Sequence, residues 1–66
     1  MLVYVAEIKP INETREVRLM YYDSKWKVKI IDNNEEDFTF EFKNEESARK
    51  SFDYAYKEEI KRMEEC

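Results

Sequence analysis

Residues 38–52 read FTFEFKNEESARKSF and contain two different hydrophobic periods. In the first half, every second residue from Phe38 to Phe42 is a phenylalanine. Such alternation is typical of a half-buried strand, so we predict a strand over Phe38–Lys43. After Asn44 the apolar residues recur at spacings of three and four, which predicts an amphipathic helix. The chain therefore changes from strand to helix at this point.

The predicted helix starts at Glu45 and has a clear N-terminal signal. Asn44 is a favourable N-cap, and Glu45 and Glu46 place negative charge in the first turn, where the helix dipole favours it. The expected apolar stripe consists of Ala48, Phe52, Ala55, Tyr56, Ile60 and Met63.

Three earlier segments also alternate between apolar and polar residues: Leu2–Ile8, Glu16–Tyr22 and Trp26–Ile31. A short turn at residues 23–25 and a longer polar loop over 32–37 would connect the last three strands. No crossover helix fits between the strands, which favours an up-and-down meander. We therefore predict one α+β domain over residues 1–66, a four-stranded antiparallel meander with one C-terminal helix packed on one face (ββββα).

The helix can cover only one face of this sheet. The bulky residues expected on that face are Val17, Leu19, Tyr21, Trp26, Val28, Ile30, Phe38, Phe40 and Phe42. The first strand adds either Tyr4, Ala6 and Ile8 or Val3 and Val5. A shift of one residue exchanges the two sets, and the pattern leaves both open.

Composition argues against several classes of function. The chain of 66 residues has no His, no Gly and one Cys. It therefore lacks the usual neutral-pH general base, a glycine-rich phosphate loop and the thiolates of a zinc site. We expect no enzyme activity, no cofactor and no metal site.

The face opposite the helix carries apolar residues among charges, which indicates a surface that binds another protein or a second copy. The predicted apolar contacts are Val3, Val5, Met20, Tyr22 and Ile31. Residues 32–66 hold 12 of the 16 acidic side chains, so an acidic surface could steer the domain to a basic, nucleic-acid-handling protein. The predicted steering residues are Glu35, Glu36, Asp37, Glu58 and Glu59.

An alternative is a single-stranded nucleic-acid-binding domain that uses the same face. An aromatic ring among basic side chains can stack bases and neutralise phosphates. The candidate residues are Arg18, Tyr22, Lys27, Lys29 and Lys43. The net charge of −4 opposes binding to a polyanion, which makes this the second hypothesis.

The leading hypothesis is a small acidic protein that binds a partner as an inhibitor or regulatory factor, of the kind that a phage or mobile element encodes. We expect it to be cytoplasmic and dimeric, because a core this small benefits from oligomerisation. Its longest apolar runs are far shorter than the roughly 20 residues that span a bilayer, so no membrane association is expected.

Overall fold

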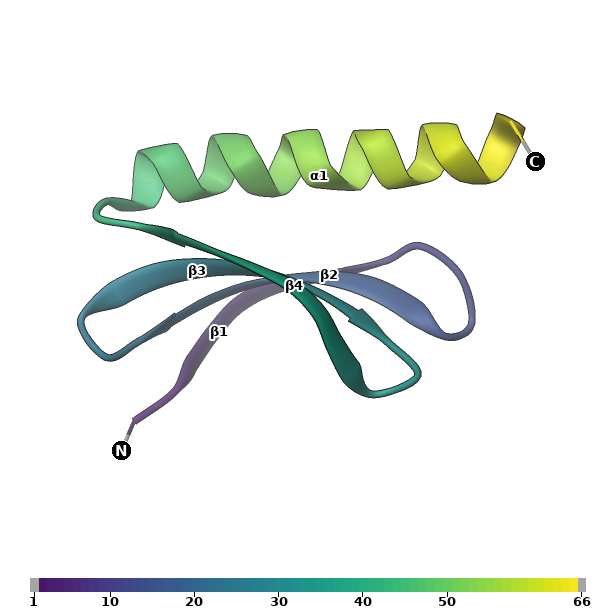
Figure 1. Cartoon of the computed structure of the whole chain (residues 1–66). Helices are drawn as coiled ribbons and strands as arrows, with labels where there is room; N and C mark the ends of the chain where they lie inside the picture. The colour runs from purple at the N-terminus through teal and green to yellow at the C-terminus, as the bar shows by residue number, and fades with distance from the viewer. Residues whose placement is uncertain (1, 66) are drawn as a thin grey trace.

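The structure is a computed structural model that describes residues 2–65, and it shows one antiparallel sheet with a helix over one face (Figure 1). The elements are β1 (Tyr4–Pro10), β2 (Arg15–Tyr22), β3 (Lys25–Asp32), β4 (Glu35–Phe42) and α1 (Glu45–Glu65). Each strand pairs with the next in the order β1-β2-β3-β4, so β1 and β4 are the edges. The predicted ββββα meander is confirmed. We call the face under α1 the covered face and the other the open face.

The turns of the last two hairpins have two residues each. Asp23 and Ser24 have φ angles of 54° and 62°, and Asn33 and Asn34 have φ angles of 54° and 65°. Two successive left-handed residues make a hairpin turn whose twist matches that of the strands. The longer loop predicted over residues 32–37 is therefore wrong, because Asn33 and Asn34 close the turn and β4 begins at Glu35.

The core lies between α1 and the central strands β2 and β3. Val17, Leu19 and Val28 are fully buried there, and Phe52 of α1 is 1% exposed. The helix begins as predicted, because the backbone N–H of Ser47 donates a hydrogen bond of 2.8 Å to Oδ1 of Asn44. Ile30, Ala48 and Ile11 complete the buried cluster, and Trp26 and Phe42 pack against it while partly exposed.

A β-bulge in β1 resolves the uncertainty over the first strand. Val5 pairs with Met20, but the next paired residue is Glu7, so Ala6 is the additional residue. Ala6 packs against the core, whereas Ile8 lies opposite Arg18 on the open face. Neither predicted set is right as a whole, because an extra residue reverses the alternation within the strand.

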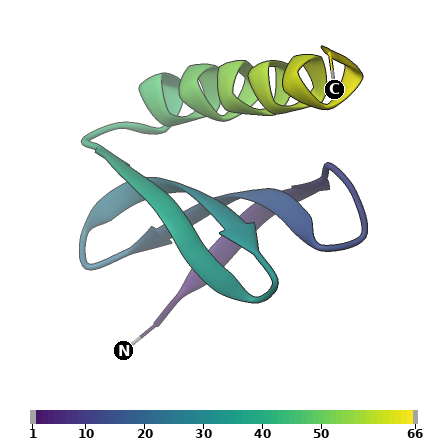
Figure 2. The ribbon, with the colours of Figure 1, turned by 45° about the vertical axis from the view of Figure 1, so that its right-hand side comes forward.

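Three of the residues predicted for the core are not covered. Phe38, Phe40 and Tyr21 are 52%, 46% and 38% exposed. All three share the covered face with the core residues. Phe38 and Phe40 lie on the edge strand β4, whereas α1 packs mainly on β2 and β3. Tyr21 lies near the end of β2, where its ring packs on Trp26 with the ring centroids 5.1 Å apart. Figure 2 shows the helix over the sheet, with β4 at the near edge. The alternation in the sequence therefore predicted correctly on which face of the sheet the phenylalanines of β4 lie. It did not predict that α1 leaves two of them exposed.

The left-handed turns lead to a stability prediction. Ser24→Gly should raise the free energy of unfolding by about 0.5–1 kcal/mol, because glycine adopts positive φ without the steric cost of a Cβ atom. Urea denaturation measures the change. The matched control is Ser51→Gly inside α1, which should lower the free energy by roughly 0.5 kcal/mol. Equal destabilisation by both variants would contradict the left-handed turn.

Candidate functional site: the groove between α1 and β4

A groove separates α1 from the edge strand β4 on the covered face. Its volume is about 450 Å³. The strand wall holds Phe38 and Phe40, whose rings stack with centroids 6.4 Å apart and planes inclined by 13°. The residues that line the groove are Ile30, Phe38, Phe40, Ser51, Tyr54, Ala55, Glu58, Glu59 and Arg62. We call this the α1–β4 groove.

The helix wall follows from the spacing of its residues. Tyr54, Glu58 and Arg62 are four residues apart and therefore lie along one side of α1. Tyr54 is 60% exposed, the highest exposure among the large apolar side chains of the helix. The small side chains of Ser51 and Ala55 leave room between this wall and the sheet. The groove therefore combines exposed aromatic rings with a carboxylate and a guanidinium at its rim.

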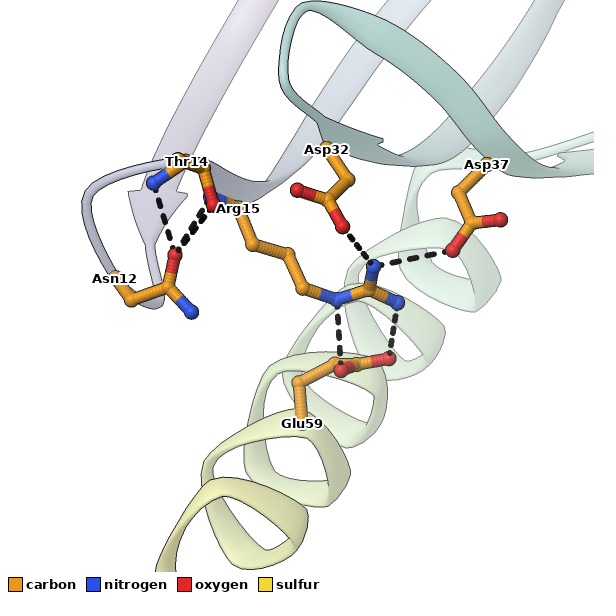
Figure 3. Close-up of polar contacts among 6 residues, drawn as sticks. All are labelled: Asn12, Thr14, Arg15, Asp32, Asp37 and Glu59. Carbon is orange, nitrogen blue, oxygen red and sulfur yellow. Dashed lines mark hydrogen bonds and ion pairs between the residues drawn. The ribbon is translucent and has the colours of Figure 1, made fainter.

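Arg15 fixes the helix beside this groove (Figure 3). Its Nε and Nη2 donate hydrogen bonds of 2.9 and 3.1 Å to the two carboxylate oxygens of Glu59. Its Nη1 lies 3.2 Å from Oδ2 of Asp32 and 3.0 Å from Oδ2 of Asp37. We call this four-residue cluster the Arg15 clamp. It links the start of β2, the β3–β4 hairpin and the C-terminal half of α1.

Within the clamp, the pair of Arg15 and Glu59 is shielded from solvent, whereas Asp32 and Asp37 are each 42% exposed. The side chains of Arg15 and Glu59 are 17% and 11% exposed. The hydrogen bonds to Glu59, and then to Asp37, raise the pKa of Arg15 above its ordinary value despite the opposing effect of burial. Bidentate pairing also fixes the orientation of the guanidinium plane. Asn12 positions the backbone of Arg15, since its Oδ1 accepts a hydrogen bond of 2.8 Å from the Arg15 N–H.

The open face carries a set of ion pairs between neighbouring strands. Nζ of Lys27 lies 3.0 Å from Glu41, and Nζ of Lys29 lies 3.3 Å from Glu36. The hydrogen bond from Lys27, with the nearby charge of Lys25, lowers the pKa of Glu41. The same hydrogen bond raises the pKa of Lys27.

Tyr22 lies within this set of charges. Nζ of Lys27 and Nζ of Lys29 are 4.2 and 5.0 Å from its ring centroid, which is cation–π distance. Hydrogen bonding to Tyr22 and then to Glu36 raises the pKa of Lys29. The basic residues predicted to bind nucleic acid are thus brought together on the open face, but Lys27 and Lys29 already have anionic partners. Arg18 pairs with Glu16 in the same way, and Lys43 lies just beyond the end of β4.

The apolar residues predicted to contact a partner lie in two environments. Met20 and Ile31 are each only 9% exposed on the open face. Lys27 and Lys29, opposite or beside them in the ladder, are 12% and 15% exposed, so their aliphatic stems help to cover the sheet. Val3 and Val5 are 50% and 42% exposed at the β1 edge. The prediction of these residues as contacts stays untested.

The predicted acidic residues do not form one surface. Glu36 pairs with Lys29, whereas Asp37 and Glu59 belong to the Arg15 clamp. Glu58 lines the α1–β4 groove, and Glu35 is exposed at the start of β4. Their role in steering a partner also stays a prediction.

The groove itself was missed from the sequence. Phe38 and Phe40 were assigned to the core, and Tyr54, Arg62 and Arg15 were not singled out. Two features of the sequence could have indicated it. The apolar stripe of the helix is too narrow to cover four strands, and Tyr54, Glu58 and Arg62 follow at spacings of four beside that stripe.

Comparisons with protein-family models, curated proteins and solved structures give no match for this chain. Over the described residues, no helix is both long enough and apolar enough to cross a bilayer. Residues 2–65 also contain no group of three or more His, Cys, Asp or Glu side chains arranged to hold a metal ion. The site must therefore be interpreted from its own geometry.

The Arg15 clamp leads to a second prediction. Arg15→Met should lower the free energy of unfolding by about 1.5–3 kcal/mol, because it leaves the shielded carboxylate of Glu59 without its cation. Arg15→Lys should cost less, since it keeps the charge but loses the bidentate geometry. Urea denaturation measures both changes. Arg49→Met is the control at an exposed helix pair and should change the value by less than about 1 kcal/mol. If Arg15→Met behaved like this control, the clamp would not hold the helix.

The pairing of Glu41 leads to a prediction about pH. Because its pKa in the folded state is lowered from 4.5, its contribution to stability is complete at neutral pH and is lost as the pH falls through the lowered pKa. Glu41→Gln should therefore lose less stability than the wild-type chain when the pH is lowered from neutral into that range. Urea midpoints across the pH series measure this difference. Glu13→Gln, in the exposed β1–β2 loop, is the control and should follow the wild type.

Proposed function

We propose that the chain is a non-catalytic protein-interaction domain whose main contact surface is the α1–β4 groove. The observation that carries this proposal is the exposure of three large aromatic side chains around one groove, with Phe38, Phe40 and Tyr54 at 52%, 46% and 60%. Aromatic residues are enriched at the centres of protein interfaces, where they contribute much of the binding energy. Contiguous exposed apolar surface of this kind marks binding sites more often than scattered residues do.

The surroundings of the groove support a protein ligand. Its rim carries Glu58 and Arg62, which could pair with polar groups around an apolar centre. The Arg15 clamp holds α1 in place relative to the β3–β4 hairpin, so the two walls are positioned before binding. A preorganised surface loses less conformational entropy when it binds.

A regulatory or inhibitory role is the form of this function that we favour. A domain of this size with exposed aromatic side chains around an open groove would act by occupying the surface of another protein. The exposed carboxylates of Glu35 and Glu58 would favour a partner with basic groups near its apolar contacts. A cytoplasmic location is part of the same proposal.

The nucleic-acid alternative has less support from the geometry. Lys27 and Lys29 would have to exchange Glu41 and Glu36 for phosphates, and the ring of Tyr22 is occupied by their ammonium groups. This cost and the net charge of −4 both work against binding of a polyanion.

A matched pair of substitutions tests the proposal. Phe40→Thr should reduce partner capture from host lysate by about tenfold or more, because it removes an aromatic anchor while keeping strand propensity. Ile8→Thr is the control: Ile8 is 45% exposed on the opposite edge strand, against 46% for Phe40. Capture is quantified by mass spectrometry with and without nuclease.

Equal capture by the two variants would contradict a role for the groove. Loss of capture on nuclease treatment, together with sensitivity to Lys27→Glu, would favour the nucleic-acid hypothesis. Circular dichroism of each variant confirms that it has folded.

A further inference from the structure

We infer that the ligand of the α1–β4 groove is a second copy of this chain, which pairs its β4 edge antiparallel with the first across a two-fold axis. This inference rests on the proposed role of the groove and names its occupant. The resulting sheet would have eight strands, with both helices on the same face and the two grooves meeting at the seam. Three observations support this arrangement.

The two edges of the sheet differ in their protection. β1 contains a bulge beside Ala6 and ends at Pro10, and Lys9 lies opposite Val17 on the covered face. Bulges, prolines and inward-facing charges are devices that discourage edge pairing. β4 has a bulge of its own at Asp37, but the run from Phe38 to Phe42 pairs regularly with β3 and holds no bulge, proline or inward-facing charge. The β4 edge is therefore the one suited to receive another strand.

The regular run of β4 selects one register of self-pairing. An axis beside Phe40 pairs residues 38–42 with themselves, so that Phe40 faces Phe40, Thr39 faces Glu41 and Phe38 faces Phe42. An axis beside Thr39 would bring the bulge at Asp37, whose carboxylate binds Arg15 on the covered face, opposite Glu41 of the second copy. An axis beside Glu41 would place two Glu41 side chains together, and like charges directly opposite each other destabilise a strand pair. The Phe40-centred register avoids both.

Pairing of the two β4 edges would bury the exposed side chains that line the α1–β4 groove. The exposed rings of Phe40 would meet each other at the seam, the exposed ring of Phe38 would meet Phe42, and Tyr54 with Glu58 and Arg62 would face the second helix. This side of the helix carries both a negative charge (Glu58) and a positive charge (Arg62). When two copies of the helix run antiparallel, Glu58 of one copy can therefore pair with Arg62 of the other.

Analytical ultracentrifugation of the purified full chain tests the dimer. We expect a reversible dimer, with a dissociation constant that Phe40→Thr raises at least tenfold and Ile8→Thr leaves within about twofold. A wild-type chain that stays monomeric at 100-fold the protein concentration of the capture assay would overturn the inference. So would a dimer that is insensitive to Phe40→Thr.

Cysteine cross-linking tests the register in a Cys66→Ser background. Chains with Thr39→Cys mixed with chains with Glu41→Cys should form a disulfide, because residues directly opposite lie within disulfide distance. Either variant alone should cross-link much more slowly, since its own copies would be diagonal neighbours. Faster cross-linking of Thr39→Cys with itself would overturn the Phe40-centred register.

The two proposals can fail separately. A monomeric chain whose capture of a different protein still depends on Phe40 would overturn the dimer but leave the groove as an interaction surface. A monomeric chain with equal capture by Phe40→Thr and Ile8→Thr would overturn both.

Discussion

The guanidinium of Arg15 joins three segments at the margin of the hydrophobic core: the start of β2, the β3–β4 hairpin and the C-terminal half of α1. The buried cluster ends around Phe52, in the first half of α1, whereas Glu59 lies two turns further along. Beyond Phe52, Tyr56 and Ile60 pack against the core while partly exposed, and the bidentate pair of Glu59 with Arg15 adds a polar attachment to the sheet. The same guanidinium binds Asp32 and Asp37 in the β3–β4 hairpin, so one side chain sets the distance between the two walls of the groove. In a chain of 66 residues, where little apolar surface is available, such a clamp has a large effect on the overall arrangement.

The two faces of the sheet are stabilised in different ways. On the covered face, Val17, Leu19 and Val28 are excluded from water by a helix. On the open face no second layer exists among the described residues, yet Met20 and Ile31 are almost as well shielded. Lysine stems provide part of this cover, and their ammonium groups are then fixed by carboxylates and by the ring of Tyr22. The long charged side chains therefore act as the missing layer.

The sequence predicted the strand faces and the helix well, because both depend on local periods. The alternation from Phe38 to Phe42 and the N-cap at Asn44 are properties of neighbouring residues. The bulge at Ala6 could not be predicted from such a local period. It depends on how β1 pairs with β2, and no residue type in β1 marks the position of the extra residue. The exposure of Phe38 and Phe40 could not be predicted either. It depends on where the helix crosses the sheet, and that position is set in part by the Arg15–Glu59 pair, whose residues are 44 apart in the chain. For the same reason Asp37 and Glu59 looked free in the sequence.

The meander also has a consequence for the order in which the molecule folds. Each strand pairs only with its neighbour in sequence, and the last two hairpins close through two-residue turns. Such local pairings require little loop closure and form early. The contacts between α1 and β2, including the pair separated by 44 residues, require the longest closure and are expected to form last. The walls of the groove would therefore come together at the end of folding. Until then the phenylalanines of β4 and the unprotected strand edge would both be open to other chains, which makes helix docking the step that limits aggregation.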